Sequence, residues 1–264
     1  MLVTGASHGI GLATARLLAD KGCRVFGTSR RGGTRTDAAV TMLELDVTSD
    51  ASVHRCVDEV LKSAGRIDVL VNNAGVGLLG AIEETTISEA KALYETNLFG
   101  VARMVGAVLP GMRAQKNGLI VNLGSLAATL PIPFHGYLSS SKAAIGSFSD
   151  ALRLELKPLG IDVTLVEPGM IATHQGARFS ALRVHAGIDV YTDAEKRALA
   201  VIERGQRSGS PPELVAAAVL SILRTDRPAR SYLVGPEKWY LRASRFLPPS
   251  AVEALVTRRF HLSG

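Results

Sequence analysis

The residues best suited to do chemistry are a serine, a tyrosine and a lysine that lie in one short stretch, Ser125, Tyr137 and Lys142. A lysine cation lowers the pKa of a neighbouring phenol, so that a tyrosine can act as an acid or a base near neutral pH. A serine hydroxyl beside them can hold the reacting oxygen. The three residue types together fit proton transfer to and from an alcohol oxygen, a chemistry that also needs a redox cofactor.

A glycine loop between a short apolar strand and a helix indicates where a cofactor would bind. The strand at residues 2–4 runs into the loop at 5–11, and residues 12–19 follow with helical periodicity. Glycines let the backbone approach a pyrophosphate, and the N-terminus of the helix supplies N–H groups and the positive end of a dipole. In this context the loop predicts dinucleotide binding rather than a mere connection.

The second expected strand, residues 24–28, is followed by two arginines, Arg30 and Arg31. An acidic residue at that point would bind the ribose 2′-hydroxyl of NAD, and none is present. Arginines can instead pair with the 2′-phosphate of NADP(H). We therefore expect NADP(H) to be preferred over NAD(H), with His8 in the glycine loop adding partial positive charge. The alternative is that both arginines sit in a solvated loop.

Strands and helices alternate along the rest of the chain. Further strands are expected at residues 40–45, 69–71, 119–123, 163–166 and 232–234, and helices at 50–64, 88–115 and 138–158. This spacing predicts an α/β fold with a single Rossmann-type, doubly wound, mostly parallel seven-stranded sheet and helices on both faces. Ligands of such sheets bind at the carboxyl ends of the strands, where the polar features fall. We expect one domain over residues 1–264.

Composition argues against several classes of protein. The chain has 264 residues, of which 47% are hydrophobic, and a formal net charge of +6. Lysines and arginines are scattered and not interleaved with aromatic residues, so no nucleic-acid partner is expected. Cys23 and Cys56 have neither metal-ligand nor disulfide spacing, so we expect no metal site and a reduced, cytoplasmic location. No signal peptide and no membrane-spanning helix are expected.

Several motifs, in order, resemble those of the short-chain dehydrogenase/reductase family over nearly the whole chain. TGxxxGIG is present at residues 4–11, NNAG at 72–75 and PG-x3-T at 168–173, and the family's asparagine, serine and lysine match Asn97, Ser125 and Lys142. The resemblance implies an enzyme that interconverts a ketone or aldehyde and an alcohol by hydride transfer with NADP(H). Tyr137 would be the acid or base, and Ser125 would hold the oxygen.

The resemblance also implies a role for each matching residue. Asn97 would hold a water that links Lys142 to solvent, and Lys142 would bind the nicotinamide ribose beside Tyr137. Thr173 would meet the carboxamide or the pyrophosphate. The other implied cofactor contacts are Gly5, Ser7, His8, Gly9, Ile10 and Gly11 around the phosphates, Asp46 and Val47 at the adenine, Asn73, Ala74 and Gly75 along the cofactor, and Pro168 and Gly169 near Thr173.

The tyrosine departs from the family's spacing, since residues 137–142 read Tyr-x4-Lys where the family has Tyr-x3-Lys. On a helix of ~100° per residue, Tyr137 points roughly 140° away from Lys142, and Leu138 takes the family position. Three readings stay open. In the first, an irregular or π-type helix start, which Gly136 would ease, turns Tyr137 into the site. In the second, the protein is an NADP(H)-binding sensor or scaffold without ordinary turnover. In the third, Ser139, a weak acid, takes the place of the tyrosine as proton donor. We favour the first.

The substrate side is expected in residues 174–210, a lid that contains a helix at 193–206, and in a C-terminal extension at 236–264. The apolar residues of the lid favour a lipophilic ketone or alcohol, such as a steroid, a retinoid or a fatty-chain carbonyl, or else simply pack the lid onto the core. Apolar residues beside arginines in the extension favour a pocket cover or a subunit contact over peripheral contact with a membrane surface. Helices 88–115 and 138–158 resemble the family's interface, which implies a homodimer or homotetramer.

Overall fold

Runs of branched apolar residues form the strands at the centre of the fold. The computed structural model describes residues 1–32, 39–172, 188–237 and 246–260. The strands in these ranges are β1 (Leu2–Val3), β2 (Val25–Ser29), β3 (Val40–Glu44), β4 (Val69–Asn72), β5 (Gly118–Leu123), β6 (Ile161–Pro168) and β7 (Ser231–Val234). They form one sheet in the order β3-β2-β1-β4-β5-β6-β7, and every pairing is parallel. The predicted seven-stranded Rossmann-type sheet is confirmed.

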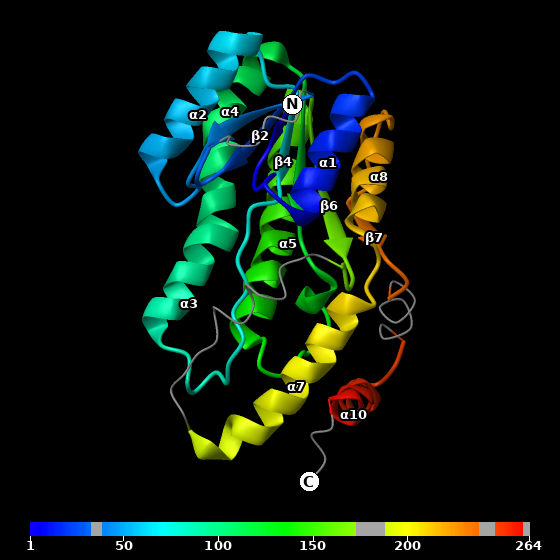
Figure 1. The fold of residues 1–264 in the computed structure, drawn as a ribbon. Helices are drawn as coiled ribbons and strands as arrows, with labels where there is room; N and C mark the ends of the chain where they lie inside the picture. Colours follow the sequence, from blue (N-terminus) through cyan, green and yellow to red (C-terminus); the bar gives the residue numbers. More distant parts are fainter. Residues whose placement is uncertain (33–38, 173–187, 238–245, 261–264) are drawn as a thin grey trace.

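Helices cover both faces of this sheet (Figure 1). One face packs against α1 and α8, and the other packs against α2, α4 and α5. The helices are α1 (Gly9–Asp20), α2 (Asp50–Ala64), α3 (Ile87–Tyr94), α4 (Gly100–Gln115), α5 (Gly136–Leu156), α7 (Asp189–Arg207), α8 (Pro212–Leu223) and α10 (Pro249–Arg259). Short 3-10 turns at Leu126–Ala128 and Lys157–Leu159 flank α5.

The core has two layers because neighbouring residues of a strand point to opposite faces of the sheet. In β1, Leu2 packs into the layer of α2, α4 and α5, whereas Val3 packs into the layer of α1 and α8. Both residues are fully buried. The strand order reverses between β1 and β4, and in sheets of this kind the ligand crevice lies at the carboxyl ends of the strands at that point.

One predicted helix is interrupted. Residues 88–115, expected as a single helix, form α3, a π-helical turn at Glu95–Phe99, and then α4. Asn97 lies inside the turn, and single π-turns of this kind are frequent at functional sites. Helix α5 begins at Gly136 rather than at residue 138, and α7 spans Asp189–Arg207 rather than residues 193–206.

The expected lid and C-terminal extension are described only in part. Residues 173–187, 238–245 and 261–264 fall outside the described ranges. What the structure gives of the lid is mainly α7, and of the extension mainly α10. Within the ranges given above, no helix combines the length and the apolar character that crossing a membrane requires.

Candidate active site

The glycine loop between β1 and α1 lies in close contact with the segment that follows β4. Gly5 has a φ of +66°, in the left-handed region that favours glycine. A Cβ atom placed on Gly11 would lie 2.3 Å from the carbonyl oxygen of Gly5 and 2.4 Å from Nδ2 of Asn73. Because these contacts are far too short, only glycine allows α1 to begin so close to the loop.

Thr4 and Asn73 join the two cofactor motifs into one unit. Oγ1 of Thr4 accepts hydrogen bonds from the backbone N–H groups of Asn73 (3.0 Å) and Ala74 (2.9 Å). Nδ2 of Asn73 donates to the carbonyl oxygens of Thr4 (2.9 Å) and Gly5 (3.1 Å). The backbone around the N-terminus of α1 is therefore held by side chains from the next strand of the sheet.

The N-terminus of α1 fits an anionic group. His8 is the N-cap residue, but no side-chain hydrogen bond caps the helix, and its first turn has no acidic residue. The first N–H groups of a helix lack intrahelical acceptors, and they lie at the positive end of its dipole. Ser7 is exposed in the loop, and Gly9 and Ile10 open the helix. This chemistry suits the pyrophosphate of a dinucleotide.

The ends of β2 and β3 bring cations and a carboxylate to the same edge. Arg30 and Arg31 are exposed just after β2. The N–H (2.9 Å) and the hydroxyl (2.8 Å) of Thr48 both donate to Asp46 Oδ1. These hydrogen bonds, with a smaller contribution from the Arg30 cation, lower the pKa of Asp46. Val47 follows and is buried.

Asn97 connects the π-turn to the site. Its side chain is buried, its Oδ1 accepts the N–H of Val76 (2.9 Å), and its Nδ2 donates to the carbonyl oxygen of Val76 (3.0 Å) and to Oγ of Ser141 (3.2 Å). A Cβ atom on Gly75 would lie 3.3 Å from Asn97 Oδ1 and 3.8 Å from Nζ of Lys142. The side chains of Asn97 and Lys142 therefore both lie next to Gly75.

Lys142 and Ser125 lie together at the carboxyl end of β5. Nζ of Lys142 donates to the carbonyl oxygen of Leu123 at 3.0 Å, and burial lowers the pKa of this lysine to about 8. Oγ of Ser125 accepts the N–H of Ala127 at 3.1 Å. Since the described chain offers no acceptor for the Ser125 hydroxyl proton, this hydroxyl is able to donate to a bound molecule.

The helix that carries Tyr137 begins regularly. Helix α5 is an α-helix from Gly136 onward, and the N–H of Ser139 donates to the carbonyl oxygen of His135 at 2.8 Å, which is the ordinary i to i−4 spacing. The described π-turn belongs to the neighbouring segment at Glu95–Phe99. The irregular start that would turn Tyr137 into the site is therefore not found in α5.

Regular spacing sets the face on which each residue lies. Leu138 is one turn before Lys142, whereas Tyr137 is one turn before Ser141, the residue bonded to Asn97. The Tyr137 hydroxyl forms no hydrogen bond with any part of the chain that the structure describes. The side chains of Tyr137 and Leu138 pack with one apolar group, which comprises Val76, Leu78 and Leu93.

The turn after β6 lies against a carboxylate from the segment that follows β7. Pro168 ends β6, and a Cβ atom on Gly169 would lie 2.2 Å from Oε2 of Glu237 and 3.2 Å from Cδ1 of Leu126. The position of Glu237 was not predicted, because it belongs to none of the motifs and only the pairing of β6 with β7 brings it here. Thr173, the last residue of the PG-x3-T motif, lies outside the described residues.

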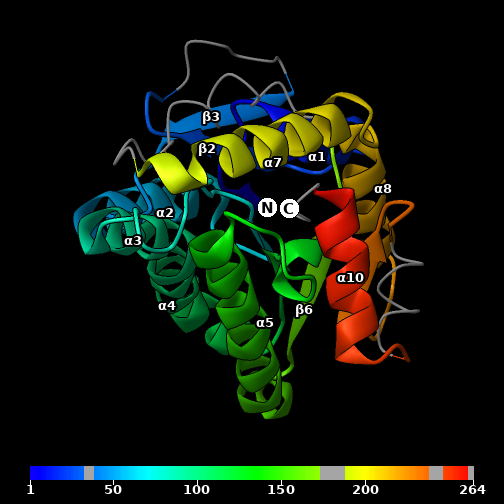
Figure 2. The same ribbon diagram turned by 90° about the horizontal axis from the view of Figure 1, so that it is seen from below.

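Apolar residues cover this end of the molecule. Helices α7 and α10 lie beyond the end of the sheet, as the views in Figures 1 and 2 agree. A pocket of about 310 Å³ opens between residues 131–136 and α10, is mostly apolar, and is also lined by Ser139 and Glu253. Next to it is an apolar cluster whose buried members are Leu79, Ala198, Ile202 and Phe260. Such a wall suits a lipophilic ligand.

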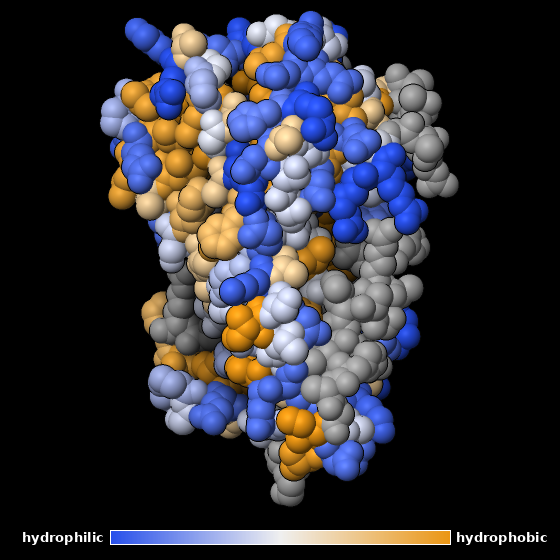
Figure 3. All heavy atoms as spheres, turned by 90° about the vertical axis from the view of Figure 1, so that its left-hand side faces the viewer, coloured by the Kyte–Doolittle hydropathy of each residue, from blue (hydrophilic) through white to orange (hydrophobic). Residues whose placement is uncertain are grey.

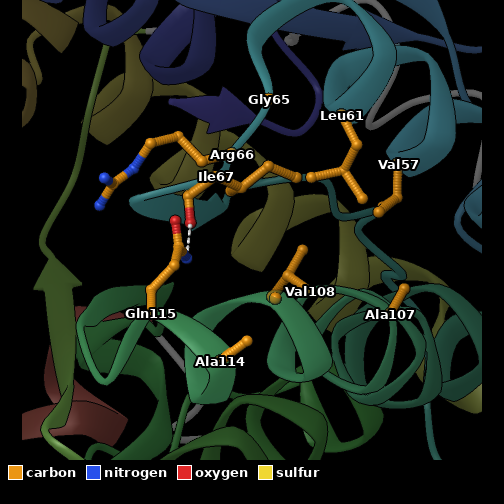
Figure 4. Close-up of a pocket in the computed structure, with 10 residues that line it drawn as sticks. Val57, Leu61, Gly65, Arg66, Ile67, Ala107, Val108, Ala114 and Gln115 are labelled. Atoms are coloured by element: carbon orange, nitrogen blue, oxygen red, sulfur yellow. Dashed lines mark hydrogen bonds between the residues drawn. The ribbon is translucent and has the colours of Figure 1, made fainter.

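A second pocket, an open groove, lies at the opposite end of the strands. It has a volume of about 370 Å³ between α2 and α4 (Figure 4), and Nε2 of Gln115 donates to the carbonyl oxygen of Ile67 there at 3.3 Å. Ile67 precedes β4, so this groove is at the amino ends of the strands. The side of the molecule that carries α2 and α4 shows gathered apolar groups in its upper part (Figure 3). None of the site residues described above lines the groove.

Comparison with known proteins decides the family. A family model described as short chain dehydrogenase matches residues 1–181. The chain belongs to the short-chain dehydrogenase/reductase family. It is 37% identical over 255 residues to a 3-ketodihydrosphingosine reductase of Bacteroides thetaiotaomicron, covering 96% of this chain and 94% of that protein. It is 31% identical over 268 residues to an NADPH-dependent 3-dehydrocapnine reductase of Ornithobacterium rhinotracheale, covering 94% and 92%.

Solved structures agree with this membership. A short chain dehydrogenase/reductase from Burkholderia phymatum in complex with NAD is similar with a TM-score of 0.79 and 26% identity, covering 96% of this chain and 94% of that one. Structures similar to this short-chain dehydrogenase/reductase contain NAD in some cases and NADP in others. The chain is thus an oxidoreductase by family, and its glycine loop and uncapped α1 suit the kind of cofactor that its structural neighbours bind.

Proposed function

We propose that this protein is an NADP(H)-dependent oxidoreductase that interconverts a lipophilic ketone and its alcohol. The observation that carries the proposal is the convergence of Lys142, Asn97 and Gly75 beside the cofactor motifs. Lys142 Nζ lies 3.8 Å from the Cβ position of Gly75, which belongs to the motif that holds the glycine loop. Ser125, with a proton to donate, stands at the end of the same strand whose Leu123 carbonyl binds the lysine.

Ser125 and Lys142 would orient and polarise the substrate. A bound NADPH would supply the hydride to the carbonyl carbon. The Ser125 hydroxyl, whose oxygen already accepts the Ala127 N–H, would donate a hydrogen bond to the carbonyl oxygen and stabilise the charge that develops there. The Lys142 ammonium, with a pKa near 8, would remain mostly charged at neutral pH and hold positive charge next to the reacting oxygen.

Tyr137 is the proposed proton donor. It lies in the first turn of α5, where backbone N–H groups have no intrahelical acceptor, so this turn can rewind more easily than the middle of the helix. A rotation of ~100°, one residue of helix, would bring Tyr137 into the position that Leu138 holds above Lys142. His135, at the N-cap, is a poorer acid, because burial lowers its pKa to about 4 and leaves it uncharged at neutral pH.

The cofactor preference is inferred from the arginines after β2. Arg30 and Arg31 stand where a ribose-binding carboxylate would favour NAD, and both are exposed and able to reach a phosphate. The nearby Asp46 carboxylate is already engaged by Thr48. These features support NADP(H) as the cofactor.

A lipophilic ketone is the proposed substrate class. The apolar cluster under α7 and α10 and the adjacent pocket support it, since both lie at the same end of the sheet as Ser125. The similar proteins named a 3-ketodihydrosphingosine reductase and a 3-dehydrocapnine reductase support a ketone as the reducible group. 3-Ketodihydrosphingosine is therefore the first substrate to test.

One observation favours a second function. Leu138 occupies the position one turn before Lys142, and α5 is regular there. A site with an apolar residue in that place would bind NADP(H) without an efficient proton donor, as a cofactor-dependent sensor or scaffold would.

Two substitutions in α5 separate these functions. NADPH oxidation is measured with 3-ketodihydrosphingosine for the wild type, Tyr137→Phe and Leu138→Tyr, and Tyr94→Phe serves as the control because the Tyr94 hydroxyl bonds to Ser140 (2.9 Å) on the same helix. If Tyr137 is the acid, Tyr137→Phe lowers kcat by about 10²–10⁴-fold and Tyr94→Phe does not. If the wild type binds NADPH without turnover and Leu138→Tyr creates turnover, the sensor or scaffold function holds.

A further inference from the structure

Glu237 presents a buried carboxylate oxygen that has no partner among the described residues. Oε2 is shielded from solvent, and none of the residues that the structure describes donates a hydrogen bond to it. Glu237 also takes part in none of the ion pairs found in the described ranges. A buried acceptor of this kind is costly unless a donor reaches it, so a donor from a bound molecule would stabilise it.

Two glycines make room for this carboxylate. A Cβ atom on Gly169 would lie 2.2 Å from Oε2, and one on Gly235 would lie 2.8 Å from the same oxygen. Gly235 also has a φ of +117°, which favours glycine. The N–H of Gly169 is used by the carbonyl oxygen of Val234 (2.8 Å), so the backbone next to Oε2 does not satisfy it.

The carboxylate lies on the side of the site next to Ser125. At the carboxyl edge of the sheet, Leu123 of β5 pairs with Val166 of β6, and Pro168 of β6 pairs with Val234 of β7. Ser125 and Glu237 follow the outer two of these three strands, so β6 and the turn after it lie between them.

Side chains from both of these segments reach the turn after β6. Leu126, the residue after Ser125, and Oε2 of Glu237 both lie within 3.2 Å of the Cβ position of Gly169. The turn after β6 therefore contacts both Glu237 and the residue that follows Ser125.

We propose that Glu237 binds a cationic amino group on the carbon next to the substrate's ketone. The inference rests on the function proposed above and narrows the substrate class to lipophilic amino ketones. The apolar cluster under α7 and α10 receives the hydrocarbon chain, Ser125 holds the ketone oxygen, and Glu237 accepts hydrogen bonds from the ammonium. An ammonium is the partner that both neutralises the carboxylate and donates to its unpaired oxygen.

The test uses two ketones that differ at the amino group, 3-ketodihydrosphingosine with its cationic amine and the N-acetyl derivative with an uncharged, bulkier amide. The wild type should turn over the free amine with the higher kcat/KM. A hydrogen bond between charged groups corresponds to about a 10- to 100-fold preference. Glu237→Gln should abolish that preference, and Glu237→Asp, which keeps the charge on a shorter side chain, should reduce it in part. The matched control is Glu59→Gln, which removes the same charge from the exposed face of α2.

A binding measurement makes the inference independent of turnover. Isothermal titration of the NADP⁺-loaded protein with decylamine and with decanol should show a preference for the amine in the wild type and in Glu59→Gln, and none in Glu237→Gln. An unchanged amine preference in Glu237→Gln overturns the inference. So does a loss of NADPH affinity with the preference retained, since the carboxylate would then serve the cofactor. Absence of turnover with every ketone, together with a Glu237-dependent amine preference, removes the proposed function and leaves this binding site standing.

Discussion

Gly11→Ala tests the contact on which the cofactor site depends. The new methyl group would meet the Gly5 carbonyl oxygen at 2.3 Å and Asn73 Nδ2 at 2.4 Å. Neither atom can move away freely, because the Gly5 oxygen belongs to the backbone and the Asn73 amide is hydrogen-bonded to the carbonyl oxygens of Thr4 and Gly5. Overpacking of this kind costs about 1–3 kcal/mol. The usual gain from replacing a helical glycine by alanine, about 0.5–1 kcal/mol, offsets part of that.

The net loss of about 0–2.5 kcal/mol in the free energy of unfolding corresponds to a fall in Tm of up to roughly 10 °C for a chain of this size. The affinity for NADPH should fall by at least about tenfold, since the backbone next to the α1 N-terminus must move. Thermal unfolding and a fluorescence titration with NADPH measure the two effects separately.

Gly106→Ala provides the matched control. Gly106 lies inside α4 with open space where its Cβ would be, so this substitution should stabilise the protein by about 0.5–1 kcal/mol and leave NADPH binding unchanged. The two Gly→Ala changes are therefore expected to have opposite signs. If Gly11→Ala behaved as Gly106→Ala does, the close approach of α1 to the loop after β4 would not be what shapes the cofactor site.

Three other predictions follow from the same geometry. Arg30→Asp should weaken NADPH by about 10- to 100-fold and NADH much less, and equal effects on both affinities would refute the 2′-phosphate argument. Lys142→Met should raise Tm at pH 7, because it removes a buried charge. The difference in Tm from the wild type should shrink between about pH 8 and 10.5, where the folded wild type loses the lysine proton while the unfolded chain keeps it. A difference that stays constant in a pH series of melting curves would contradict this. Asn97→Ala should lower the free energy of unfolding by about 1–3 kcal/mol in urea titrations by leaving the N–H of Val76 without its partner, and an unchanged midpoint would count against the bond network.

The sheet could be predicted because its signals are local. Strands such as β5 and β6 are apolar runs bounded by polar or turn residues, and the alternation with helices implies parallel pairing. The glycine loop was predictable for the same reason, since Gly5 and Gly11 are needed for the backbone conformation and the close approach that the motif implies. The positions of Ser125 and Lys142 were predictable too, because Ser125 comes just after strand β5 and Lys142 lies near the start of helix α5.

The π-turn and the carboxylate at Glu237 could not be predicted in this way. One extra residue in the hydrogen-bond ladder around Asn97 hardly disturbs the apolar periodicity of residues 88–115, so the pattern reads as one helix. Glu237 meets Gly169 only because β7 pairs with β6, a contact between distant parts of the chain. The sequence favoured an irregular start of α5 that would turn Tyr137 into the site, and this expectation is wrong: Gly136 permits such a start but does not impose it, and α5 begins regularly.

The most direct test of the central claim is the rate of NADPH oxidation with 3-ketodihydrosphingosine, compared between the wild type and Tyr137→Phe. If the chain is an NADP(H)-dependent ketone reductase with Tyr137 as its acid, the wild type turns the ketone over and Tyr137→Phe loses about 10²–10⁴-fold in kcat while still binding NADPH. Full turnover by Tyr137→Phe would contradict the role of the tyrosine, and NADPH binding without turnover by the wild type would contradict the proposed activity itself.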